Sequence, residues 1–313
     1  MRRWWTGAAA LALLAPVVGG CHRAGPAPHP HYVLGPAWQG DVAWFYPTES
    51  YSAVQTGLAA IAPDRGGRLT ADGETYRPDA LAAAHQTLQL PAVVRLTNLD
   101  DGRQMLVRLN DRGPASPARL VAVTPRVATL LGLRDGTPVR LEVMAEASHQ
   151  AVDAVGGGPR LAIATAPLEA ITAQALPPLD GAAAGGVRAG GVRAGGAGSG
   201  AGTTVIGRPA AADAAPAADV VLPGTVTRVP VGPVRLMLRL GTFTNPGPAG
   251  VQAQHVPALS AYVVSHPSGR STTYAVLAGP YPTARAAEAA LDEALRAGVP
   301  DARIIARSDA DQF

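Results

Sequence analysis

The sequence predicts a mainly β chain with an added α+β domain: a small closed β-barrel, a long linker and a sheet-and-helix domain of order βαββαβ. Three observations support this division. Short alternating strands separated by turn signals fill residues 40–145. Residues 146–230 are rich in Gly, Ala and Pro and show little periodicity, and periodic elements return over residues 231–309. Gly and Pro account for 65 of the 313 residues, an excess typical of chains with long unstructured segments.

Residues 1–20 have the pattern of a secretory signal peptide. Two arginines follow Met1, a short apolar run covers residues 8–18, and two glycines precede Cys21. The apolar run is too short to span a bilayer. The ending Val-Gly-Gly-Cys resembles a bacterial lipoprotein box, in which Cys21 would be lipidated and become the mature N-terminus. The alternative is an ordinary signal peptide, cleaved nearby, with an unused cysteine.

Residues 21–39 are expected to be a flexible tether, because their first part is rich in Pro, His and Gly. His22, His29 and His31 lie there without a scaffold, which favours a spacer over a metal site. By analogy with other lipoproteins, His22 after the cysteine favours the periplasmic face of the outer membrane. A formal net charge of +3 in 313 residues gives no support to nucleic-acid binding.

The predicted barrel elements follow from local patterns. Strong helix formers over residues 79–88 predict a short helix, and Asp101-Gly102 predicts a hairpin turn between two alternating strands. In order, we expect a strand at 42–46, a loop at 51–67, a helix at 79–88, strands at 92–97 and 104–109, a helix at 127–133 and a strand at 138–144.

The C-terminal elements predict a ferredoxin-like half-open sheet. The Ala-rich helix at 283–297 has its apolar residues on one stripe and is capped by Gly298. The order is a strand at 235–240, a weak helix at 251–260, strands at 261–265 and 272–278, the Ala-rich helix and a strand at 302–306. The linker between the two domains, 146–230, is expected to be disordered, because it cannot bury enough apolar surface.

Residues 68–114 hold the side chains that could carry chemistry. Glu74 follows a Gly-containing acidic turn, His85 follows a run of alanines, and Asp111 lies in a second turn-like motif. Two acidic residues held at strand ends would suit a barrel enzyme that acts on sugar polymers. Each residue also has a structural explanation: Asp111 as an Asx turn, Glu74 as an exposed turn residue and His85 as a core histidine.

Three motifs favour the chemical interpretation. TADGETY at 70–76, AAAHQTLQLP at 82–91 and RLNDRGP at 108–114 resemble the rare lipoprotein A (RlpA) family. The resemblance implies a six-stranded double-psi β-barrel followed by a SPOR domain, and a septal lytic transglycosylase activity on peptidoglycan. It places the catalytic acid-base positions on Glu74 and Asp111 and a functional histidine on His85.

In the implied reaction the sugar's own 6-hydroxyl attacks, which leaves a 1,6-anhydro product. Our hypothesis makes Asp111 first acid and then base, with Glu74 polarising it or sharing its proton. His85 would orient a carboxylate or contact the substrate. We also expect Asn110, Arg112 and Tyr76 to contact the glycan. No metal ion or cofactor is required.

The C-terminal domain resembles a SPOR domain through LRLGTF at 238–243 and YAVLAGPY at 274–281. SPOR domains bind glycan strands stripped of stem peptides. The expected glycan contacts are Arg239, Phe243 and Tyr281.

Three functions remain open at this stage. The first is an endolytic transglycosylase that cleaves MurNAc–GlcNAc β-1,4 bonds at the septum. The second is a non-catalytic peptidoglycan-binding lipoprotein that recruits cell-division proteins. The third is an expansin-like protein that loosens the wall without cleavage. The expected partners are denuded glycan strands, a membrane through the lipid anchor and divisome proteins.

Overall fold

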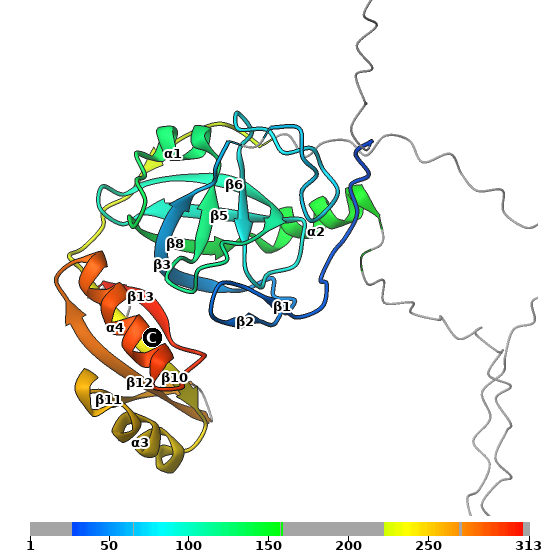
Figure 1. Ribbon diagram of the computed structural model, residues 1–313. Helices are drawn as coiled ribbons and strands as arrows, with labels where there is room; N and C mark the ends of the chain where they lie inside the picture. Colours follow the sequence, from blue (N-terminus) through cyan, green and yellow to red (C-terminus); the bar gives the residue numbers. More distant parts are fainter. Residues whose placement is uncertain (1–26, 65, 157, 159–221, 269–270, 309–313) are drawn as a thin grey trace, which may run out of the picture. The chain divides into compact units, whose positions relative to one another are not determined.

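The computed structural model describes residues 27–64, 66–156, 158, 222–268 and 271–308 (Figure 1). These residues form a β-barrel and, later in the chain, a four-stranded sheet with helices. The predicted signal peptide, Cys21 and most of the predicted linker lie outside the described residues. Within the described ranges, no helix is both long and apolar enough to cross a membrane.

Six strands close into the barrel. Their order around the ring is β4-β7-β3-β8-β5-β6, and β6 pairs with β4 to complete it. The β3–β7 and β4–β6 pairs are parallel and the other pairs are antiparallel. This closed, mixed barrel confirms the predicted double-psi fold. Its strands are β3 (Val54–Ile61), β4 (Ala82–His85), β5 (Ala92–Asn98), β6 (Arg103–Arg112), β7 (Val121–Val123) and β8 (Pro138–Val143).

Apolar side chains from all six strands fill the barrel. Along β6 the inward residues are Met105, Val107 and Leu109, which recur with the period of two that a strand requires. The residues between them therefore point outward, and this places Arg108 on the outer surface. Two short ribbons are added outside the ring: β1 (Trp38–Gln39) pairs with β2 (Trp44–Phe45), and β9 (Thr227–Arg228) pairs with the start of β6.

Helix α1 (Pro125–Leu131) confirms the helix predicted at 127–133, with its start two residues earlier. The Thr124 side chain caps the N-terminus by accepting a hydrogen bond from Val127 N. Gly132 ends the helix in the left-handed conformation at φ 66°.

Helix α2 (Ala145–Val155) corrects the predicted start of the linker at residue 146. Ser148, Ala151 and Val152 are buried at helical spacing. The Ser148 hydroxyl also bonds the main-chain N and O of Val93, at 3.0 and 3.1 Å. The barrel domain therefore extends to about residue 155.

The helix predicted at 79–88 is wrong, because this segment contains strand β4. An isolated ten-residue helix is only marginally stable in water. In the strand, Ala82–His85 pairs on one side with β6 and on the other with β7, which satisfies its backbone groups and closes the barrel. Its small side chains are all buried, so tertiary pairing overrides the helix propensity of alanine.

The loop predicted at 51–67 is also wrong over its middle, where β3 runs for eight residues. Polar residues in its first half hide the strand pattern. Gly57 marks a close approach, since a Cβ there would lie 2.7 Å from the Cβ of Leu120.

Residues 27–36 are not a free tether, which corrects that part of the prediction for 21–39. His29 N donates to Gly73 O at 2.9 Å, and His31 N donates to Asp72 O at 2.8 Å. Val33 forms a β-bridge with Leu90. We call residues 27–34 the N-terminal arm; it lies against the acidic turn of the predicted site.

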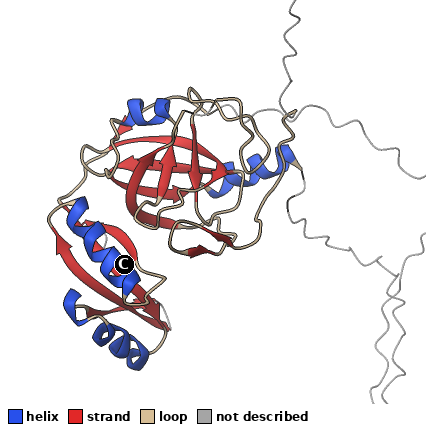
Figure 2. Cartoon of the chain, in the orientation of Figure 1, coloured by secondary structure: helices blue, strands red, loops and turns tan. Residues whose placement is uncertain are grey.

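The C-terminal domain has the predicted βαββαβ order. Its sheet order, β11-β12-β10-β13 with antiparallel pairs, is the ferredoxin-like arrangement. Both helices lie on the same side of the sheet (Figures 1 and 2), and α4 buries a stripe of Ala and Leu against it. The elements are β10 (Val234–Phe243), α3 (Pro246–His255), the 3₁₀ turn η1 (Pro257–Leu259), β11 (Tyr262–Ser268), β12 (Ser271–Tyr281), α4 (Ala284–Arg296) and β13 (Arg303–Ser308).

Ala83→Leu tests whether β4 belongs to the barrel wall. Ala83 is buried in the barrel core, so the larger side chain should lower the free energy of unfolding by about 1–3 kcal/mol. Urea denaturation measures this change. Ala145→Leu, at an exposed position, is the matched control and should change stability by less than about 0.5 kcal/mol. A neutral Ala83→Leu would indicate that the segment is not part of the core.

Candidate active site

The site lies where the loop 68–76 folds against the last residues of β6. The loop is a small hairpin: Thr70 N donates to Glu74 O at 2.8 Å, and Tyr76 N donates to Arg68 O at 2.7 Å. Gly73 has φ +84°, and a Cβ on it would lie 2.3 Å from His29 O. Glycine is therefore required at the predicted acidic turn, both for its conformation and for the close approach of the arm.

Glu74 reaches from this loop to β6. Its Oε1 accepts hydrogen bonds from Arg108 Nε at 2.7 Å and from another Arg108 nitrogen at 2.6 Å. Its Oε2 accepts from Asn110 Nδ2 at 2.8 Å. Because the side chain is still about 20% exposed, it stays reachable from outside the barrel.

Asp111 lies in β6 and not in a separate turn. A register irregularity in the β4–β6 pair, between Ala83 and Ala84, sets Asp111 opposite Ala84. One oxygen accepts from the main-chain N of Ala71 at 3.0 Å and of Arg112 at 2.9 Å. The other oxygen is paired with Arg68 at 2.5 Å.

Arg68 is a site residue that the sequence analysis missed. Its guanidinium carbon lies 4.9 Å from the ring centroid of Tyr76, and its side chain is 41% exposed. Tyr76, predicted to contact the glycan, is instead buried beneath this arginine. Arg68 and Tyr76 flank one short hairpin, but Asp111, the partner of Arg68, is more than 30 positions away, so no local pattern could reveal the ion pair.

Glu74 and Asp111 are therefore brought to the same end of the barrel, as predicted, but His85 points elsewhere. Nδ1 of His85 accepts from the main-chain N of Thr87 and Leu88, at 3.2 and 3.1 Å. This leaves the proton on Nε2, which donates to Gln55 Oε1 at 3.2 Å. Burial, together with the nearby charge of Arg112, lowers the pKa of His85 to about 3, so the ring is neutral.

Arg112 holds the arm in place. Its guanidinium donates to the carbonyl oxygens of Leu88 and Leu34, the latter at 2.6 Å. It also lies 3.5 Å from the carbonyls of His85 and Val33. Arg112 contacts the Asp111 carboxylate through its main-chain N, whereas the Arg108 side chain pairs with Glu74. The geometry of Arg112 fits a structural clamp better than a substrate contact.

Asp72 is the second residue that the sequence analysis left out of the site. It is fully buried, and its Oδ1 accepts from Thr70 Oγ1 at 2.7 Å and from Glu74 N at 3.2 Å. Its Oδ2 is buried without a hydrogen-bond partner in the described structure. Burial, and secondarily the charge of Glu74, raise the pKa of Asp72 to about 7. Asp72 therefore keeps its proton up to about pH 7.

The three predicted glycan contacts of the C-terminal domain do not share one face. Leu238 and Leu240 point toward the helices, so Arg239 lies on the opposite face of β10, where it is exposed. Phe243 and Tyr281 pack against the helix-side cluster. Each ring lies over a glycine two positions earlier in the chain.

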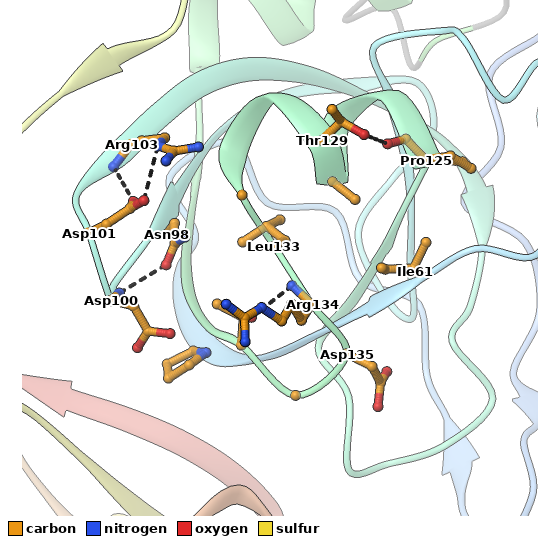
Figure 3. Close-up of a pocket in the computed structure, with 15 residues that line it drawn as sticks. Ile61, Asn98, Asp100, Asp101, Arg103, Pro125, Thr129, Leu133, Arg134 and Asp135 are labelled. Atoms are coloured by element: carbon orange, nitrogen blue, oxygen red, sulfur yellow. Dashed lines mark hydrogen bonds and ion pairs between the residues drawn. The ribbon is translucent and has the colours of Figure 1, made fainter.

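A separate cavity of about 940 Å³ lies at the other end of β6, beside α1 and the β5–β6 hairpin. Figure 3 shows Asp101 paired with Arg103 on one side of it and Asp135 on another. Nε of Arg103 lies 3.0 Å from Oδ2 of Asp101, so these two charges of the cavity lining neutralise each other. None of the predicted site residues lines this cavity.

No group of three or more His, Cys, Asp or Glu residues in the described ranges is arranged to hold a metal ion. His29 and His31 both belong to the arm, with ring centroids 6.0 Å apart. His31 Nδ1 lies 2.9 Å from the carbonyl oxygen of His29.

Comparison with known proteins supports the assignment of the barrel. Residues 54–143 match a family model described as lytic transglycolase, and the match covers all six barrel strands. The barrel region is therefore similar to this family along its whole ring of strands. The resemblance to the RlpA family noted in the motifs is thereby confirmed for the barrel.

Several curated proteins named endolytic peptidoglycan transglycosylase RlpA are similar to this chain. The Escherichia coli K12 protein is 38% identical over 130 residues, which is 41% of this chain and 35% of the relative. The Campylobacter jejuni protein is 39% identical over 104 residues, 32% of this chain and 38% of the relative. The protein of Pseudomonas aeruginosa UCBPP-PA14 is 44% identical over 77 residues, 25% and 23% respectively. The chain thus spans about a third of the length of the first two relatives and less of the last.

Arg112→Gln should loosen the N-terminal arm. A hydrogen bond to a charged group contributes about 1.5–3 kcal/mol, so losing the bonds to Leu34 and Leu88 should speed hydrogen exchange at Val33 N about tenfold or more. Amide exchange measured by NMR reports this rate. Arg77→Gln, an exposed arginine of the neighbouring loop, is the control and should leave the rate unchanged. Unchanged exchange in Arg112→Gln would contradict the clamp.

Asp72→Asn should change how stability depends on pH. Asp72 has a pKa of about 7 in the folded protein, against an ordinary value of 3.8, so the folded state binds its proton more tightly. Its contribution to stability is complete below about pH 4 and is lost as the pH rises to about 7. The variant cannot ionise, so its stability relative to the natural protein should increase across this window. The gain is a few kcal/mol at most, since one pKa unit corresponds to about 1.4 kcal/mol. Denaturation of both proteins at pH 4, 5.5, 7 and 8 measures it, and parallel curves would show that Asp72 titrates normally.

Proposed function

We propose that this protein is an endolytic peptidoglycan lytic transglycosylase. It would cleave the β-1,4 bond between MurNAc and GlcNAc and prefer glycan strands that lack stem peptides. One observation carries the proposal: a barrel of the lytic transglycolase family brings Glu74 and Asp111 together at one end through the fold of loop 68–76 on β6. The names of the similar RlpA proteins support it.

The reaction needs no water. The 6-hydroxyl of MurNAc attacks its own C1, so the O6–C1 bond forms as the bond from C1 to O4 of GlcNAc breaks. The proton lost from O6 and the proton gained by O4 balance, and one residue can deliver the second and collect the first. Asp111 is our candidate for this exchange. The negative charge of Glu74 would stabilise the oxocarbenium-like centre at C1.

Arg68 and Arg108 set the charge balance of this site. Each guanidinium group pairs with one of the two acids, so the charges of these four side chains cancel. A sugar oxygen that approaches the outer oxygen of Asp111 has to displace Arg68. The half-exposed side chain of Arg68 is free to turn away and bind another hydroxyl of the glycan. His85, neutral and bonded to Gln55, would act by stiffening β4 beside Asp111.

The remaining parts of the chain would bring this site to its substrate. We propose that the C-terminal domain, whose element order is βαββαβ, is a SPOR domain that binds denuded glycan through Arg239 or through the Phe243–Tyr281 side. Lipidation of Cys21 would anchor the protein to the outer membrane, facing the periplasm. Septal enrichment and contacts with division proteins would follow from the preference for stripped strands.

A second function, glycan binding without cleavage, is favoured by one specific observation. In the described structure Asp111 is held by Arg68 and by main-chain N–H groups, and Glu74 is held by Arg108 and the side-chain amide of Asn110. If these pairs persist when glycan binds, neither acid can exchange a proton, and the barrel would be a binding module. An expansin-like action would also leave the glycan uncut.

Digestion of peptide-free murein distinguishes these functions. We expect fragments with 1,6-anhydro ends, detected by mass spectrometry after chromatography. Asp111→Asn and Glu74→Gln should each lower the cleavage rate by about 100-fold or more, because they remove a proton-transferring or charge-stabilising group. Asp79→Asn, an exposed acid close by in the chain, is the control and should cleave normally. Binding without anhydro products would support the binding module and contradict the transglycosylase.

A further inference from the structure

Asp72 occupies an unusual place beside the site. Its carboxyl lies directly behind Glu74 in the loop, tied to that residue by the hydrogen bond from Glu74 N to Oδ1. The arm covers the same turn, through the bonds that His31 N and His29 N make to the carbonyls of Asp72 and Gly73. No solvent reaches the carboxyl, and its Oδ2 has no partner among the described residues. A charge on such a group is costly, whereas the neutral acid is tolerated.

The charged and titratable groups around Asp72 come from three segments. Its own loop contributes Glu74, which disfavours a second negative charge, and β6 contributes Arg108, which favours one. From the same two segments, Arg68 and Asp111 are already paired with each other. The arm contributes His29 and His31, whose main-chain groups contact the turn. Among the described residues, Arg108 is therefore the nearby cation that Glu74 and an ionised Asp72 would have to share.

We propose that Asp72 is a positioning residue whose neutral form keeps Glu74 in its working geometry, so that its ionisation sets an upper pH limit on cleavage. The inference rests on the proposed transglycosylase function and deepens it. When Asp72 loses its proton, two carboxylates compete for Arg108, and the partnerless Oδ2 must find a donor inside the turn. Both effects pull the loop away from the arrangement in which Glu74 bonds Arg108 and Asn110.

A change at Thr70 provides a second test, because it should raise the pH limit of cleavage. Its hydroxyl donates to Oδ1 of Asp72, a bond that favours the ionised form. Thr70→Val keeps the shape of the side chain and removes this donor. The neutral form of Asp72 should then persist to a higher pH, and the limit on cleavage should move upward. Damage to the loop alone would instead lower the rate at every pH.

The experiment measures cleavage of peptide-free murein from pH 5.5 to 9 with the full-length protein and its variants. Above about pH 7, the cleavage rate of the natural protein should fall about tenfold for each pH unit, because the working form requires one proton on Asp72. Asp72→Asn, checked by mass for deamidation of the introduced amide, should keep its rate within about twofold from pH 6.5 to 8.5. Thr70→Val should shift the limit upward, and Asp79→Asn and His31→Asn should follow the natural profile.

A readout independent of activity completes the test. The ¹³C shift of the Asp72 carboxyl, assigned by its loss in Asp72→Asn, should titrate at the same pH as the activity. If Asp72→Asn retains the pH limit of the natural protein, or if the carboxyl titrates near pH 4, the inference is overturned while the transglycosylase function stands. If the natural protein leaves murein uncut at every pH, the proposed function fails first, and the carboxyl shift still reports whether Asp72 is held neutral.

Discussion

Two crossed ion pairs hold the site together. The loop 68–76 contributes one cation and one acid, Arg68 and Glu74, and strand β6 contributes the complementary acid and cation, Asp111 and Arg108. Each segment thus supplies the counter-ion for the acid of the other. The Arg108–Glu74 pair is the more buried of the two and is costly to break, because the remaining charge is left without a partner. The position of both candidate acids depends on this one arrangement.

The N-terminal arm makes the site dependent on residues that come before the barrel in the chain. Arg112 binds carbonyl groups of the arm and of the segment after β4, and so joins three segments beside Asp111. The arm in turn covers the Asp72–Gly73 turn and keeps solvent from the Asp72 carboxyl. Burial raises the pKa of Asp72, and main-chain contacts of the arm contribute to that burial.

Patterns within a short window predicted much of this fold. The β5–β6 hairpin followed from alternating residues and the Asp-Gly turn, and α1 followed from its apolar spacing. The βαββαβ order of the C-terminal domain was also predicted, because its strands alternate locally and α4 has a clear apolar stripe. Strands β3 and β4 were missed, since their pairing partners are distant and their own residues favour loop or helix.

The sequence by itself determined the residue types and motifs of the site: Glu74 after a glycine turn, Asp111 at the end of a strand, and arginines nearby. These features involve residues that are close together in the sequence, so a short sequence pattern is enough to predict them. Only the tertiary structure decided that Arg68 pairs with Asp111 and that His85 bonds Gln55. It also decided that Asp72 is buried, which raises its pKa. Ion pairing, side-chain direction and burial depend on which distant segments meet, and closure of the barrel brings those segments together.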